Sequence, residues 1–334
     1  MNKGIDVEII KDSTNWTGKR LTTFVLKYPR YIHAELMTHR VFSKNSASSR
    51  AIPIERMIEN IKEDKVNPIW TLNQKGMQGL EVEDTQKLSF ASINWNAAWS
   101  DAVNWAKSLS GLGIHKQNVN RLLEPWMHIK IILTGTDFDN WFELRDHKDA
   151  QPEIQNLARK MKVAMEKSQP QLLQPGEWHI PFDNKYDIVQ LTDEALKRTV
   201  SGFGADREWE DAILDLRLKV SVANCARISY NNVDGSKSTI EGDLDIYKKL
   251  VESEPLHASP SEHQAQVPYP SDYVSGEMSI KHILKIKDSG ETGTKPLDEI
   301  SNSIELVTER GRYYSNLQGW IQLRKIIEEL KYKK

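Results

Sequence analysis

The longest uninterrupted helical pattern runs from Gln86 to Leu109, is rich in Trp and Ala, and ends before two glycines. Glycine just beyond the last helical residue is a common helix stop. Further helices are predicted over 32–39, 54–65, 119–123, 208–218, 240–251, from Pro152 onward and from about Trp320. Strand patterns are few, at 21–27, at 129–133 and in the extended end of 220–230. Because helices outnumber strands and do not alternate with them, we predict an α+β fold with a mixed or antiparallel sheet and long helices.

Composition narrows the class of protein. The 334 residues suffice for one large domain or two ordinary ones, and a net charge of -2 gives no broad basic surface, so we expect no nucleic-acid partner. The single cysteine, Cys225, excludes an internal disulfide and a Cys-rich metal cluster. No apolar run is long enough to cross a bilayer, so we expect no membrane partner and a cytoplasmic location.

The densest polar cluster is Thr38 to Arg50, read THRVFSKNSASSR. Hydroxyls and turn N–H groups can donate to a phosphate, and a guanidinium can clamp it with two parallel hydrogen bonds. The alternative is a solvated turn whose Ser and Asn residues cap the helix that begins near Ile54. Composition alone leaves both interpretations open.

Three further clusters carry polar side chains. Arg145 precedes the helix that starts at Pro152, in the segment LRDHKDAQPEIQ, and taken alone this pattern favours an ordinary helix start with salt links over a site. CARISY (225–230) and HASPSEH (257–263) follow later in the chain. Pro260 disfavours the two-turn helical spacing that a His-rich zinc site needs, so we predict no metal.

Together the four clusters resemble the flavin-dependent thymidylate synthases. Thr38-His39-Arg40 and the spaced Ser43, Asn45, Ser48 and Arg50 match that family's RHR signature at every spacing, with Thr38 in place of the first arginine. Arg121, Asn140, Leu144-Arg145 and Ala150-Gln151 follow its C-terminal half. CARISY and HASPSEH resemble two motifs of its N-terminal half, which precede the signature in the usual order.

The reversed order of the halves suggests a circular permutation of the family's fold, of a kind that would suit a bacteriophage genome. Residues 1–175 then form the usual C-terminal half, 176–205 a connector, and 206–270 the usual N-terminal half of the same catalytic domain. Residues 271–334 form an extension of unknown role. Termini that lie close together at a surface make such permutation physically easy.

The resemblance implies binding roles for individual residues. The residues expected to contact flavin are His39, Arg40, Asn45, Asn140, Ser229, Ser259 and Glu262. The residues expected to bind the nucleotide are Ser46, Ser48, Ser49, Arg50, Arg121 and Arg145. The candidate catalytic residues are His257, near flavin and folate, with Arg145, Ser48 and Arg50.

The resemblance also implies a reaction. The expected cofactor is FAD, with NADPH and methylenetetrahydrofolate as co-substrates, dUMP as substrate, dTMP as product and a homotetramer with shared sites. Thr38 and Ser46 depart from the family's arginine and glutamate, which leaves open a hydroxymethylase or methylase acting on dUMP or dCMP. A third hypothesis is a degenerate homologue that binds nucleotide without catalysis. Arg324, in the C-terminal stretch, is a candidate replacement for the missing arginine.

Overall fold

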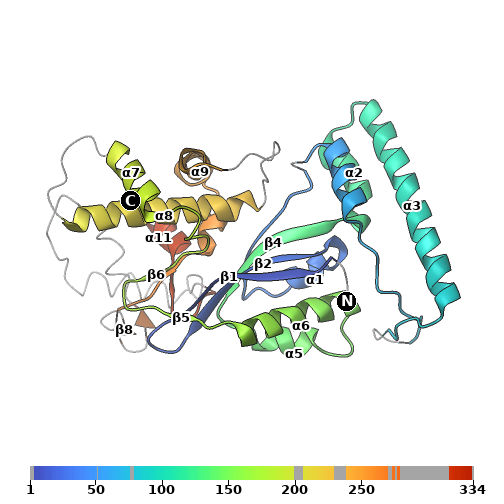
Figure 1. Cartoon of the computed structure of the whole chain (residues 1–334), viewed down its shortest axis with the longest axis horizontal. Helices are drawn as coiled ribbons and strands as arrows, with labels where there is room; N and C mark the ends of the chain where they lie inside the picture. The colour runs from blue at the N-terminus through green and yellow to red at the C-terminus, as the bar shows by residue number, and fades with distance from the viewer. Residues whose placement is uncertain are drawn as a thin grey trace.

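A five-stranded sheet forms the centre of the molecule (Figure 1). The computed structural model describes residues 4–50, 52–75, 79–198, 206–228, 238–269, 273–274, 277–278 and 316–332. The strands are β1 (Asp6–Thr14), β2 (Arg20–Pro29), β3 (Ser43–Ser46), β4 (His128–Gly135) and β5 (Gln171–Leu172), in the order β3-β4-β2-β1-β5. Neighbouring strands are antiparallel except β1 and β5, which are parallel. The predicted α+β fold with a mixed sheet is therefore confirmed.

Strand β2 is central because both of its faces are apolar. Side chains alternate between the faces of a strand, and Phe24, Leu26 and Tyr28 point into one core while Val25 joins another. A strand buried on both faces shows a continuous apolar run instead of a polar–apolar alternation. The predicted strands at 21–27 and 129–133 are confirmed as the interiors of β2 and β4.

Helices cover both faces of this sheet. On one face, α6 (Pro152–Lys167) packs with α5 (Asp139–Arg145), and Pro152 occupies the first turn of α6, as predicted. On the other face, Cys225 and Ile228 pack against Val25 and Ile132. The segments 206–228 and 20–29 therefore share a core although they lie far apart in the sequence.

A separate helical layer stands at one end of the sheet (Figure 1). It contains α2 (Ile54–Glu63), α3 (Thr85–Gly111), α4 (Lys116–Val119) and the 3-10 helix η2 (Asn120–Trp126). The Asp84 side chain accepts hydrogen bonds from the N–H groups of Gln86 and Lys87 and so caps α3. Trp99 and Trp126 pack beside Met57 in this layer's core. The predicted helices at 54–65 and 86–109 are confirmed.

The opposite end of the sheet carries the later part of the chain. It contains β6 (Trp178–His179), α7 (Ile188–Arg198), α8 (Asp206–Arg227), α9 (Ile240–Tyr247), the π-helical turn η3 (Lys248–Glu252), the 3-10 turn η4 (Ser259–Glu262), β7 (Ala265–Gln266), β10 (Ile321–Gln322) and α11 (Leu323–Tyr332). Strands β10, β7 and β6 form a small sheet, and β8 (Tyr273–Val274) pairs with β9 (Glu277–Met278). The short helix η1 (Arg30–Ile32) and α1 (His33–Met37) follow β2, where a helix was predicted.

The extended end predicted for 220–230 is absent from its described part, because α8 continues as a helix to Arg227. Val220, Val222 and Cys225 are buried within packed neighbours, so tertiary packing overrides the β-branched preference. Tyr230 lies outside the described residues, as does the predicted loop at 288–294. Strand β1 and helix α7 were not predicted. Within the described residues, no helix is long and apolar enough to cross a membrane.

Candidate functional site

Two distant parts of the chain meet around a cavity of about 250 Å³. Strand β3 and the turn η4 lie side by side and supply most of its polar lining. The lining residues are Lys44, Asn45, Ser46, Ala226, Leu250, His257, Ser259 and Pro260. Four of the predicted site residues, Asn45, Ser46, His257 and Ser259, are thus brought together within one chain.

Strand β3 holds its side chains at the edge of the sheet. It pairs with β4 on one side only, and Asn45 lies opposite Ile132 in that ladder. The Asn45 side chain is buried, with 7% exposed, yet it faces the cavity. An edge strand leaves one side free for contacts other than strand pairing. Strand β3 also contacts η4.

His39 and Arg145 form a second polar group. Arg145 Nε donates to His39 Nε2 at 3.0 Å, and Arg145 Nη1 donates to Glu35 Oε2 at 2.9 Å. The His39 ring lies edge-on to Trp141, with 4.8 Å between ring centroids. Burial lowers the pKa of His39, and the charges of Arg145 and Lys44 lower it further. His39 is therefore a neutral acceptor near neutral pH.

Glu124 organises a third polar group. Its Oε1 accepts from Ser49 Oγ at 2.9 Å and from Arg121 Nη1 at 2.7 Å, and it lies 3.1 Å from Arg30 Nη2. Two of the predicted nucleotide ligands, Ser49 and Arg121, therefore share one carboxylate. Such a shared acceptor fixes the orientation of both donors.

The C-terminal segment 316–332 joins β3 to η4. The buried Gln322 amide donates to Ser43 Oγ at 3.1 Å and to the Glu262 carbonyl at 2.8 Å. Asn316 also hydrogen-bonds Ser43 Oγ, at 3.0 Å. Arg324 makes ion pairs with Glu262 and Glu328. The segment therefore spans the boundary between the two halves that line the cavity.

The remaining predicted site residues lie outside these contacts. Arg40, Arg50 and Asn140 are exposed, Asn140 on α5 together with Arg145. The Ser48 hydroxyl accepts from the Arg50 N–H at 3.4 Å. Ser229 lies outside the described residues. Among those residues, no group of three or more His, Cys, Asp or Glu side chains could hold a metal ion.

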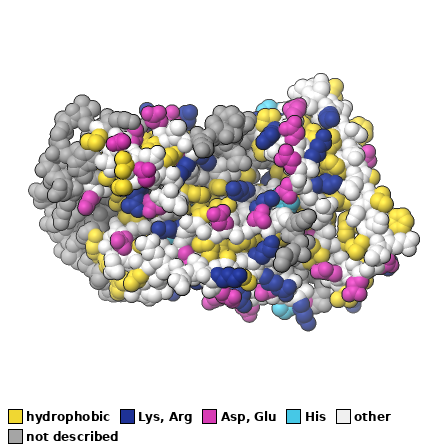
Figure 2. Space-filling model, viewed as in Figure 1, with side chains coloured by type: hydrophobic (Ala, Val, Ile, Leu, Met, Phe, Trp, Pro, Cys, Tyr) yellow, Lys and Arg dark blue, Asp and Glu magenta, His cyan; other side chains and the backbone are white. Residues whose placement is uncertain are grey.

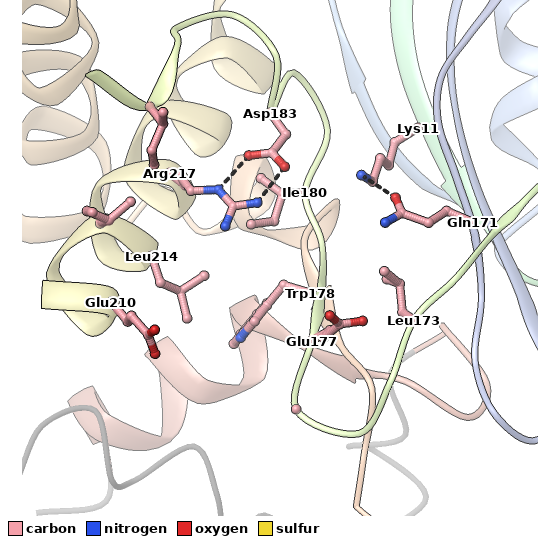
Figure 3. A pocket seen from close by; sticks show the side chains of 13 residues that line it. Lys11, Gln171, Leu173, Glu177, Trp178, Ile180, Asp183, Glu210, Leu214 and Arg217 are labelled. Atoms are coloured by element: carbon pink, nitrogen blue, oxygen red, sulfur yellow. Dashed lines mark hydrogen bonds and ion pairs between the residues drawn. The ribbon is translucent and has the colours of Figure 1, made fainter. Parts of the chain in front are cut away.

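A second, larger cavity of about 530 Å³ lies between the β1–β5 edge and α8 (Figure 3). Arg217 and Asp183 line it and form a bidentate ion pair at 2.7 and 2.6 Å. Lys11 donates to Gln171 at 3.2 Å on the β1–β5 side of it. None of the predicted site residues lines this cavity, and these charged groups already have partners. We therefore regard the smaller cavity as the candidate site.

Three contacting residues were missed by sequence reasoning. Lys44 and Glu124 sit among predicted residues but carry no separate sequence signal, and Gln322 is distant in the sequence. Burial lowers the pKa of His33 to about 4, with contributions from Arg30 and Lys44, while Glu124 opposes them. The charges of Arg30, Lys44 and Glu124 therefore all act on the His33 ring.

Known proteins provide an independent comparison. The family model described as thymidylate synthase complementing protein matches residues 20–171. No curated protein matches the chain. A crystal structure of a UMP/dUMP methylase, PolB, from Streptomyces cacaoi bound with 5-Br UMP is 17% identical, has a TM-score of 0.41, and covers 50% of this chain and 90% of that chain. The same methylase bound with 5-Br dUMP is 16% identical, has a TM-score of 0.40, and covers 50% and 91%.

The family match covers β2 through the first residue of β5. It includes Arg121, and also Thr38–Arg50 and Arg145 from two of the four clusters on which the resemblance to this family was based. The match ends at residue 171, so the permuted order of 206–270 stays a prediction. Residues 20–171, slightly less than half of the chain, are similar to the thymidylate synthase complementing protein family.

Proposed function

We propose that this protein methylates a pyrimidine nucleotide, converting dUMP to dTMP with methylenetetrahydrofolate, NADPH and FAD. The family match supports the nucleotide substrate and the methylation. The main structural support for this proposal is the cavity that Asn45 and Ser46 of β3 line together with His257 and Ser259 from the predicted second half. Residues from both predicted halves of one catalytic domain thus line one space.

The side chains around the cavity fit a polar, anionic ligand. Asn45, Ser46, Ser259 and His257 can all donate hydrogen bonds, and Lys44 adds a positive charge. The volume of about 250 Å³ is below the roughly 300–1,000 Å³ of typical small-molecule pockets, so the cavity holds part of a ligand the size of FAD. We propose that further contacts come from a partner subunit of a homotetramer.

Bound in its reduced form, flavin would supply the hydride that turns the transferred methylene into a methyl group. The protein's own residues bind and orient. Arg145 and Arg121 would pair the nucleotide's phosphate or polarise its uracil carbonyls, which favours attack by C5. His39 would accept hydrogen bonds as a neutral ring, since its pKa is lowered. Methylenetetrahydrofolate supplies the carbon, and NADPH supplies the two electrons consumed.

Mass spectrometry of the nucleotide after anaerobic incubation with FAD, NADPH, methylenetetrahydrofolate and dUMP tests this proposal. We expect a product heavier by one methylene unit. His257→Gln should lose turnover, whereas His115→Gln, an exposed histidine at the start of α4, should not. Both are His-to-Gln changes, so a difference between them reports on the position.

Other outcomes of the same experiment distinguish the alternatives. A hydroxymethyl product, or turnover of dCMP without turnover of dUMP, would replace thymidylate synthesis with the second hypothesis. The departures at Thr38 and Ser46 motivate that hypothesis. A colourless protein that takes up no FAD and yields no product would favour the non-catalytic nucleotide-binding homologue.

A further inference from the structure

The side chains that line the cavity between β3 and η4 carry a positive charge without a balancing negative charge. Lys44 contributes a cation, and among the described residues that line the cavity there is no aspartate or glutamate. The other polar lining groups are the neutral side chains of Asn45, Ser46 and Ser259, together with His257. A concave surface with one sign of charge concentrates ligands of the opposite sign. This lining selects an anion.

The Lys44 ammonium is only partly satisfied by the protein. It donates to the His39 carbonyl oxygen at 2.5 Å, and no carboxylate of the described residues lies within 4.0 Å of it. Burial lowers the pKa of Lys44, and the more distant charge of Glu262 partly offsets this effect. Arg324 already pairs with Glu262, so that carboxylate is not held for Lys44 alone. A half-buried ammonium with these partners still has donor capacity for a ligand.

Asn45 provides a second, independent indication of a ligand. Its side chain is 93% buried, since only 7% is exposed, and it lines the cavity. Its amide makes no hydrogen bond within the part of the chain that the structure describes, and its polar atoms are not sealed off from solvent but open to the cavity. An amide placed in this way can donate a hydrogen bond to a polar atom bound in the cavity.

We propose that Lys44 binds a phosphate group inside this cavity, with Asn45 and Ser259 as neutral donors to the same group. Lysine is suited to this role because its ammonium is a compact charge with three donors. Which molecule carries the phosphate, dUMP or FAD, depends on the proposed function. That the cavity binds a phosphate anion does not depend on it. Lys44 is thus assigned a binding role that the family motif does not give it.

The competing explanation is structural. Lys44 could serve only to tie the His39 carbonyl to β3, in which case its replacement would affect every ligand equally or none. A phosphate-binding role predicts a loss confined to ligands that carry phosphate. The experiment therefore compares charged ligands with neutral analogues.

Four forms of the full chain are needed: wild type, Lys44→Met, Lys44→Arg and Lys130→Met. Methionine keeps most of the apolar stem of lysine and removes the charge. Lys130 is an exposed lysine on β4, next to β3, and does not line the cavity, so Lys130→Met is the matched control. Isothermal titration calorimetry with inorganic pyrophosphate gives the affinity for the anion without any requirement for flavin or methyl transfer.

In this titration we expect Lys44→Met to weaken pyrophosphate binding about 10- to 100-fold, the range typical for loss of one charge-assisted contact. Lys44→Arg should recover most of the affinity, and Lys130→Met should match wild type. Equal pyrophosphate affinity in wild type and Lys44→Met would overturn the proposal. So would an absence of pyrophosphate binding to wild type.

Two further pairs of ligands identify the source of the phosphate. If Lys44→Met weakens dUMP but not deoxyuridine, the nucleotide phosphate is the ligand group; if it weakens FAD but not riboflavin, the diphosphate is. Equal weakening within both pairs would overturn the phosphate assignment in favour of the structural explanation. Pyrophosphate binding that depends on Lys44, together with no methylated product, would overturn the proposed function and leave the anion site standing.

Discussion

Arg145 donates a hydrogen bond from Nε to His39 Nε2, 3.0 Å away, although 106 positions separate them in the chain. The donor is permanently charged, so the acceptor nitrogen of His39 must carry a lone pair and the neutral ring keeps its proton on Nδ1. Burial of the imidazole acts in the same direction on its pKa. The arginine thus orients the histidine and adds to the effect of burial, which is the larger cause of the lowered pKa.

Replacing Arg145 by alanine should raise the pKa of His39, because one of the nearby positive charges disappears. The pKa should stay below its ordinary value, since burial is the largest cause of the shift. NMR titration of the His39 ring measures this change. Arg159→Ala is the control, because Arg159 pairs with Asp146 on the outer side of α6. An unchanged His39 pKa in Arg145→Ala would show that Arg145 does not set the charge of His39.

The buried amide of Gln322 should control the geometry of the cavity. Gln322→Leu keeps a similar volume but removes the donor to Ser43 Oγ and to the Glu262 carbonyl. Ser43 Oγ keeps a donor in Asn316, so the Glu262 carbonyl is the acceptor left without its donor, at a cost of about 1–3 kcal/mol. We expect urea denaturation to show that loss and calorimetry to show weaker nucleotide binding. Gln318→Leu, at an exposed position of the same segment, should show neither. A loss of stability with unchanged nucleotide affinity would confine Gln322 to a structural role.

Local sequence patterns predicted helices and strands correctly where a single local preference determined the conformation. The run at 21–27 has the length and β-branched content of a strand, and β2 contains it. Pro152 marks the start of α6, and the long helix ends at Gly111, where glycine was expected to end it. The described part of 220–230 stays helical to Arg227 because packing on α8, which no local pattern records, decides its conformation.

The candidate site was only partly predictable for the same reason. Asn45, Ser46, His257 and Ser259 were identified through motifs, and the cavity unites them. Lys44 stands inside the motif at a position with no motif role, and Gln322 lies far beyond the family match. Their importance arises from β3 meeting η4 and the C-terminal segment. Contacts between residues so far apart in the chain leave no periodic pattern in the sequence from which they could be predicted.

Acid should destabilise this protein through two buried histidines. His179 and His263 belong to a buried hydrogen-bonded chain in which Thr23 and Thr134 connect them. Burial lowers the pKa of His263 to about 3 and also lowers that of His179. The folded state therefore stays neutral where the unfolded state binds protons. The free energy of unfolding should begin to fall as pH drops below about 6.5 and continue falling toward pH 3.

Denaturation in guanidinium chloride at a series of pH values measures this loss. Each histidine contributes a slope of about 1 kcal/mol per pH unit within that window. His263→Gln should reduce the slope between pH 6 and 4 by about that amount, whatever its effect at neutral pH. His147→Gln should leave the slope unchanged because His147 is exposed. Identical slopes in wild type and His263→Gln would contradict the assignment.

Asp243 should be among the most sensitive positions of the later part of the chain. Its carboxylate is fully buried and accepts from Lys185 at 3.0 Å and from Arg227 at 2.7 Å, while Asn224 and Tyr186 complete the group. Asp243→Asn preserves the shape but removes the charge that both cations face. Removal of one partner from a buried ion pair typically costs about 3–5 kcal/mol. We expect a loss of that order in urea denaturation and almost none for Asp245→Asn, which is exposed on the same helix.

Arg227 adjoins Ala226, which lines the candidate cavity, so nucleotide affinity should fall together with stability. Wild-type stability in Asp243→Asn would mean that neither cation depends on this carboxylate, and that α8 and α9 are held together by their apolar contacts.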